Sequence, residues 1–296
     1  MLIRYVLIFL VLGWTAAVEA KLSVVATSPS MGALAREIGA DDIDLKVLAP
    51  PDRDIHTLQA RPTMMRSLRS ADMVLAVGAD LEVGWLPVAI SGAANPRILP
   101  GREGYLEAAA QVELLDAGGP ADRALGDVHP VGNPHVNMDP LRMAQVGQVL
   151  AVQLGRLDPA NAAVYTDRAA TFSQKVAARL KTWRNATAGA PGVVLFHRDA
   201  IYLLDRLGVP LLGEIEPVPG VPPTASHLKQ LHDEHSGRKG IILYPVFQSS
   251  QAPEKLAADL GWEAVELPLD PPKDADGEGY LSLIDEWVTA IASAKN

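Results

Sequence analysis

Short apolar strands alternate with amphipathic helices in two stretches of the sequence, and a long helical segment lies between these stretches. The predicted strands lie at 22–28, 43–50, 72–78, 97–101, 192–197, 209–217, 240–247 and 262–269. The predicted helices around them lie at 31–40, 56–71, 198–208, 251–261 and 280–296. Continuous apolar strands separated by helices are typical of parallel sheets that are covered on both faces. The sequence therefore predicts an α/β fold.

The helical segment at 140–187 sets the predicted domain organisation. Its apolar residues recur at spacings of three and four, interrupted only at Asp158-Pro159. A flexible linker would be short and polar, so we interpret this segment as a long backbone helix that joins two lobes. Each lobe is then a parallel sheet flanked by helices, at 21–139 and at 188–296. The alternative is a pair of helices within a single domain.

The first twenty residues have the pattern of a secretory signal peptide. Arg4 precedes an apolar run, and small residues follow it up to Ala20. The alternative is a retained membrane anchor, but the run is shorter than the roughly 20 apolar residues that a bilayer span needs. We therefore expect export and cleavage after residue 20, and a periplasmic location suits a protein of this kind.

Composition narrows the function further. The chain contains no cysteine, which excludes disulfides, thiolate metal sites, a cysteine nucleophile and a lipidated N-terminal cysteine. The formal net charge of −9 argues against nucleic acid and anionic membranes as partners.

Three histidines and one aspartate lie next to turns. His56 follows a proline-rich turn after the strand at 43–50, and His135 lies between Asn133-Pro134 and Asp139-Pro140. His197 ends the strand at 192–197, and Asp270 follows the strand at 262–269. Ligands of open α/β sheets bind at the carboxyl ends of the strands. These four residues could therefore converge in a crevice between the lobes.

Three imidazoles and one carboxylate form a donor set that suits Zn²⁺. Mn²⁺ prefers more oxygen ligands. The residues alone leave two interpretations open, because a histidine at a strand end can also be an ordinary surface or hydrogen-bonded residue. The partners of the second ring nitrogens stay unassigned, although Asp54 and Asp199 are near in sequence.

Several motifs in order resemble the zinc and manganese receptors of bacterial ABC importers, the ZnuA-like family of periplasmic solute-binding proteins. The resemblance extends from the signal peptide to the C-terminal helix. The matching stretches are DIHTLQARP, NPHVNMDP with Asn137 where the family often has Trp, FHRDAIYLLDRLGV, GEIEPVPGVPPTASHL, and LDPP before YLSLIDEW. This chain lacks the long histidine-rich loop of many zinc receptors, so functions of that loop do not transfer to it.

The resemblance implies a receptor that binds metal and delivers it to an inner-membrane ABC permease, not an enzyme. It implies that His56, His135, His197 and Asp270 are the metal ligands. It also implies two lobes that move little on binding. Manganese receptors of the family commonly have Glu at the position of His197, so Zn²⁺ is the expected cargo and Mn²⁺ the alternative. We expect a monomer, and leave open whether a periplasmic metallochaperone loads the metal.

Three rival functions are weighed against this one. A manganese or iron receptor of the same family differs only in its metal. A zinc hydrolase would need an open coordination position and a general base, and the sequence has no HExxH motif. An adhesin, which the family also includes, is disfavoured because no lipid anchor or sorting signal is found.

Four histidines remain outside the predicted ligand set. His129, in GDVHPVG, is either an additional ligand that hands metal to the site or an exposed loop residue, and we favour the loop residue. His227, His232 and His235 lie in SHLKQLHDEH, which reads as a polar helix. A second metal site there is the alternative to a solvated helix face.

Overall fold

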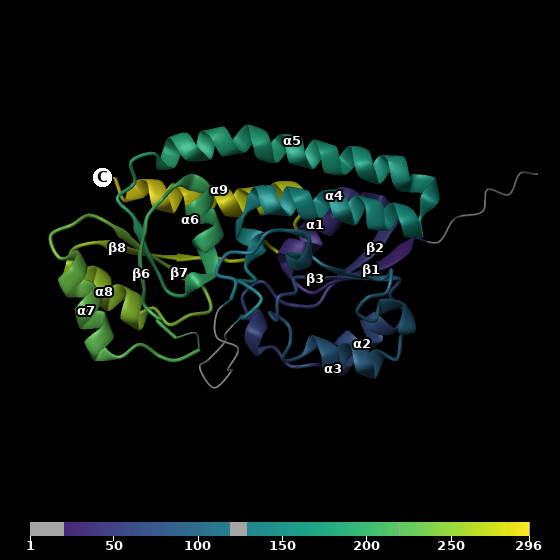
Figure 1. Ribbon diagram of the computed structural model, residues 1–296, viewed down its shortest axis with the longest axis horizontal. Coiled ribbons are helices and arrows are strands. Elements are labelled where there is room, and N and C mark those ends of the chain that lie inside the picture. Colours follow the sequence, from purple (N-terminus) through teal and green to yellow (C-terminus); the bar gives the residue numbers. More distant parts are fainter. Residues whose placement is uncertain (1–20, 119–128, 219, 296) are drawn as a thin grey trace, which may run out of the picture.

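Two four-stranded parallel sheets form the frame of the computed structural model, which describes residues 21–118, 129–218 and 220–295 (Figure 1). The strands are β1 (Leu22–Ala26), β2 (Ile43–Val47), β3 (Met73–Ala76), β4 (Tyr105–Glu107), β5 (Val193–Leu195), β6 (Leu211–Glu214), β7 (Ile241–Pro245) and β8 (Glu263–Leu267). The first sheet has the order β2-β1-β3-β4 and the second β6-β5-β7-β8. The predicted α/β fold with two parallel sheets is confirmed. The predicted signal peptide at 1–20 lies outside the described residues.

Helices cover both sheets. They are α1 (Pro29–Gly39), α2 (Pro62–Arg69), α3 (Leu86–Ala93), α4 (Pro140–Leu157), α5 (Ala162–Thr187), α6 (Ile201–Leu207), α7 (Ala225–His235), α8 (Gln251–Leu260) and α9 (Gly277–Ser293). Several helices have an N-cap side chain that accepts a hydrogen bond from the backbone of the first turn. These side chains are Ser28 for α1, Thr224 for α7 and Asp276 for α9. Within the described ranges, no helix combines the length and apolarity that a membrane crossing requires.

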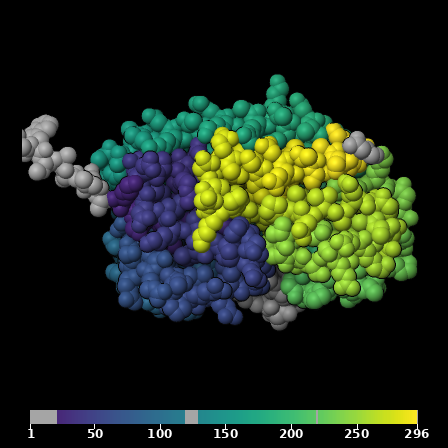
Figure 2. All heavy atoms as spheres, turned by 180° about the vertical axis from the view of Figure 1, so that it is seen from behind, coloured from purple at the N-terminus to yellow at the C-terminus, as the bar shows by residue number. Residues whose placement is uncertain are grey.

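The connecting segment consists of two helices. Asp158 ends α4, and its Oδ2 accepts hydrogen bonds from Asn161 and from the hydroxyl of Tyr165, both at 2.7 Å. Pro159 lacks the N–H that a continuing helix needs. The chain therefore reverses direction after α4, and α5 runs back along α4. Helix α5 alone leads from the first sheet to the second (Figure 1). Seen from behind, the teal atoms of this connecting segment run along the top of both halves (Figure 2).

For the first half, one predicted strand is wrong and one helix was missed. Residues 97–101 form no strand; Pro96–Ile98 is a short 3-10 helix, and the edge strand of the sheet is β4. Pro96 precedes this stretch and Pro100 lies within it, and proline cannot donate to a strand ladder. Helix α3 was not predicted, because Pro87 and Gly92 weaken its helical pattern.

The larger of two hydrophobic clusters extends through both halves, and the smaller one lies within the second half. The larger cluster continues from β1 and β3 through α4 and α5 to β5, β7 and α9. Hydrogen bonds also cross between the halves: Asn137 donates to the Leu269 carbonyl at 3.0 Å, and the Tyr280 hydroxyl donates to the Asn137 carbonyl at 2.7 Å. These contacts hold the carboxyl ends of the two sheets next to each other.

Candidate metal site

The four predicted ligands line one cavity of about 240 Å³ where the carboxyl ends of the two sheets meet. The ring centroids of His56 and His135 are 5.3 Å apart, and that of His197 lies 5.8 Å from His135 and 6.4 Å from His56. His135, His197 and Asp270 are each less than a tenth exposed. The structure thus brings together side chains that are more than two hundred positions apart in the sequence.

His56 and His135 are each oriented by the side-chain oxygen of the residue two positions earlier. Oδ1 of Asp54 accepts from the backbone N–H of His56 at 2.9 Å and faces its ring Nδ1 at 2.8 Å. Two residues before His135, Oδ1 of Asn133 accepts from the backbone N–H at 2.9 Å and faces Nδ1 at 3.0 Å. A carboxylate or amide oxygen can only accept, so Nδ1 of each ring carries the proton. The lone pair of each ring therefore lies on Nε2.

Neighbouring elements hold these two turns in place. Trp85, fully buried, donates from Nε1 to the carbonyl of Ile55 at 3.0 Å. Asn133 donates from Nδ2 to the carbonyl of Arg198 at 2.9 Å, which ties the His135 turn to the loop after β5. His197 lies two residues past the end of that strand, with Nδ1 3.8 Å from Oε2 of Glu216. The ring positions therefore depend on packing from both halves.

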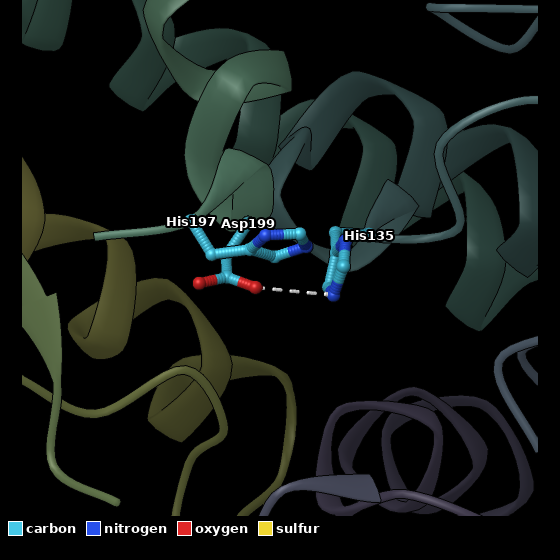
Figure 3. A group of neighbouring side chains, drawn as sticks. All are labelled: His135, His197 and Asp199. Carbon is cyan, nitrogen blue, oxygen red and sulfur yellow. Dashed lines mark ion pairs between the residues drawn. The ribbon is translucent and has the colours of Figure 1, made fainter. Parts of the chain in front are cut away.

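Asp199 is a site residue that the sequence analysis did not assign. Its Oδ1 lies 3.2 Å from Nε2 of His135, and both side chains are buried. His135, His197 and Asp199 each offer one ligand atom, and these atoms all lie within 4.8 Å of one another (Figure 3). Asp199 lies in the 3-10 turn at Arg198–Ala200 and lines the cavity, whereas the sequence shows only two polar residues between His197 and Ala200.

Asp270 faces the same cavity and is held by the start of α1. Its Oδ1 accepts from the backbone N–H of Ser30 at 2.8 Å and from the Ser30 hydroxyl at 2.5 Å. These bonds engage one carboxylate oxygen.

Burial governs ionisation in the cavity. It raises the pKa of Asp199 to about 7 and that of Asp270 to about 6, although hydrogen bonds from Ser30 oppose the second shift. Burial lowers the pKa of His135 well below its usual value, and charge on the neighbouring histidines lowers it further. A protonated Asp199 can donate to Nε2 of His135. An ionised Asp199 leaves two acceptors facing each other, which a cation would stabilise.

His129 lies against the cluster, so its interpretation as an exposed loop residue is wrong. It is half-buried, and its ring centroid is 5.2 Å from that of His56. Burial, and next the charge of His56, lower the pKa of His129 to about 4.

The histidines of α7 have structural partners. His227 and His235 face the carbonyls of Glu214 and Leu212 at 2.8 and 2.9 Å and so attach α7 to β6. His232 lies on the exposed side of the helix beside Asp233.

Known proteins resemble this chain in sequence. The sequence model of the family "Zinc-uptake complex component A periplasmic", ZnuA, matches residues 24–294. The high-affinity zinc uptake system protein ZnuA of Paracoccus denitrificans is 26% identical over 295 residues, which cover 90% of this chain and 88% of that protein.

Solved structures share the fold. A ZnuA deletion mutant with zinc bound has a TM-score of 0.75 at 21% identity and covers 93% of this chain and 98% of its own. The solute-binding protein FpvC of Pseudomonas aeruginosa in complex with Mn²⁺ has a TM-score of 0.78 at 24% identity, with the same coverage of 93% and 98%.

Proposed function

Because the chain belongs to the ZnuA family of periplasmic zinc-uptake components, we propose that it is a periplasmic receptor that binds zinc and delivers it to an ABC permease of the inner membrane. The observation that carries this proposal is the convergence of three imidazoles on one buried cavity, with the lone pairs of His56 and His135 fixed on Nε2. A receptor of this kind makes and breaks no covalent bond in its cargo.

We propose that His56, His135 and His197 supply three nitrogen ligands and that a buried carboxylate supplies an oxygen. Asp270 is the carboxylate that the family resemblance indicates. Asp199 offers a carboxylate oxygen within 4.8 Å of the ligand atoms of His135 and His197. Zinc accepts either combination, since it binds imidazole nitrogen and carboxylate oxygen at similar distances of about 2.0–2.2 Å.

Titration of the metal-free protein tests the cargo. We expect one Zn²⁺ per chain in calorimetry and a preference for Zn²⁺ over Mn²⁺ of about 100-fold or more, because nitrogen-rich sites bind manganese weakly. Metal analysis of the purified protein should agree. Displacement of zinc by an equal concentration of manganese would contradict the proposal.

A manganese receptor is the second candidate, and the carboxylates favour it. Asp199 and Asp270 line the cavity, and Glu216 lies 3.8 Å from His197, so several oxygen donors are within reach of one ion. The competition experiment separates the two candidates directly.

The raised carboxyl pKa values predict that zinc binding releases protons. At pH 6 Asp199 is mostly protonated and Asp270 about half protonated. A ligating carboxylate must be ionised, so binding at pH 6 should release about one proton, and apparent affinity should rise from pH 5 to pH 8. Calorimetry in buffers of different ionisation enthalpy measures this release.

Single substitutions identify the carboxylate involved. If Asp199 is the ligand, Asp199→Asn should remove most of the proton release and weaken zinc binding, whereas Asp270→Asn should keep more of both. The reverse result would assign the role to Asp270. Asp233→Asn, on the exposed face of α7, is the matched control. Wild-type binding without proton release at pH 6 would show that neither carboxyl is deprotonated by the metal.

A further inference from the structure

His129 begins the described stretch 129–218, and backbone hydrogen bonds pair this start with residues 115–118. The N–H of Gly118 donates to the Pro130 carbonyl at 3.1 Å, and the N–H of Gly132 donates to the His129 carbonyl at 3.0 Å. The N–H of Asn133 donates to the Leu115 carbonyl at 2.8 Å. This pairing continues directly into the turn that carries His135. The ring of His129 is therefore attached to the same framework as the predicted ligands.

The two ends of the His129 ring face groups of different kinds. Nδ1 lies 3.1 Å from the carbonyl oxygen of Ala79, which can only accept a hydrogen bond, so Nδ1 carries the proton. Nε2 lies 3.1 Å from Nε2 of His56. The lone pair of His56 is also on Nε2, because its Nδ1 donates to Asp54. When both rings are neutral, they direct lone pairs at each other, an arrangement that a proton or a metal ion between them stabilises.

The turn that provides the Ala79 carbonyl has an unusual backbone. Gly78, Ala79 and Asp80 all have positive φ, at 84°, 49° and 65°. A residue other than glycine in this region is energetically costly, and such strain is concentrated at functional sites. Buried Glu82 holds the turn by accepting from the N–H groups of Val77 and Gly78 at 2.7 and 3.0 Å. The strained turn places an acceptor where it fixes the tautomer of His129.

We propose that His129 is a further metal ligand, bound through Nε2 next to His56. The proposal rests on the proposed function and adds a fourth imidazole to it. Two ligand nitrogens at about 2.0–2.1 Å from a tetrahedral Zn²⁺ lie about 3.3 Å apart, close to the 3.1 Å between these two Nε2 atoms. A fourth imidazole makes the donor set richer in nitrogen and so favours zinc over manganese. Since zinc can expand to five ligands, one carboxylate can bind as well.

X-ray absorption spectroscopy of the zinc-loaded full chain counts the imidazoles. We expect four in the wild-type protein and three in His129→Gln, which keeps a polar side chain without the ring. Calorimetry should show zinc affinity weakened at least about 10- to 100-fold in this variant, the range for groups that support metal ligands. Preference for zinc over manganese should fall as well. His232→Gln, on the exposed face of α7, is the control and should match wild type.

Each outcome decides one proposal. Three imidazoles in the zinc-loaded wild type, or a His129→Gln affinity equal to that of His232→Gln, would overturn the role of His129 and leave the receptor function standing. Failure of the wild type to bind zinc would overturn the receptor function itself. The imidazole count of the wild type decides the question even if the variant folds poorly.

Discussion

His135→Ala should weaken zinc binding by about 100- to 1000-fold. The free energy of a buried four-ligand zinc site is about 10–16 kcal/mol, so one ligand corresponds to about 3–4 kcal/mol and to that change in dissociation constant. His135 is the ring to remove, because it lies within contact distance of both His56 and His197 and faces Asp199. Competition with a chelator of known zinc affinity measures the loss.

The control separates loss of a ligand from loss of structure. His232→Ala removes an imidazole from the exposed face of α7 and should leave zinc affinity unchanged. Thermal unfolding of the metal-free His135→Ala protein should be cooperative, because removal of the ring leaves the Asn133 turn and its bond to Arg198 in place. An unchanged zinc titration of His135→Ala would remove the basis of the metal site. His197→Ala should behave in the same way.

Asp139→Ala should lower the free energy of unfolding by about 3–5 kcal/mol, since it leaves buried arginine charge without its partner. Asp139 is fully buried, and its Oδ2 lies 2.5 Å from Arg142 and 2.7 Å from Arg206. Its Oδ1 accepts from the N–H of Leu141 at the start of α4. Urea denaturation at neutral pH measures the change.

The Asp139 substitution should also disturb the metal site. Arg206 belongs to α6 and Asp139 precedes α4, so this ion pair joins the two halves just four residues after His135. Asp233→Ala removes an exposed carboxylate that pairs with Lys229, and it should change stability little. Equal stability of the two variants would show that the buried pair is not what holds α4 to α6.

The sequence pattern predicts the strands well where burial dictates the residues. The cores of β1, β3, β5 and β7 contain continuous buried apolar runs, which indicate parallel strands without knowledge of their neighbours. It fails at β4, a three-residue edge strand whose pattern is too short to distinguish from a loop. Of the segment 140–187, which we interpreted as one long helix, only α5 joins the two sheets, because the break at Asp158 is visible in the sequence but the reversal of direction depends on packing.

The candidate site also contains residues that the sequence indicated and residues that it did not. His56, His135, His197 and Asp270 were candidates because each stands beside a turn after a strand or before the helical segment, and the family resemblance is what implied that they are ligands. Asp199 and His129 received no ligand role, because their importance lies in distances to His135 and His56, which only the folded chain fixes. The hydrogen-bond partner of the His56 ring could have been predicted from the sequence. Asp54 precedes His56 by two residues, as Asn133 precedes His135. That repeated spacing is the signal that sequence reasoning could have used.

The hydrogen bonds to Asp54 and Asn133 that orient His56 and His135 have a consequence for the speed of metal capture. An imidazole in water exchanges between two tautomers, and only one of them offers a given nitrogen to an ion. In this protein folding itself removes that choice for His56 and His135, so an ion that arrives at a pH above the pKa of Asp199, about 7, meets nitrogens in the tautomer that binds it. The rate of loading should then depend on how fast the ion loses its hydration water, not on proton rearrangement within the rings.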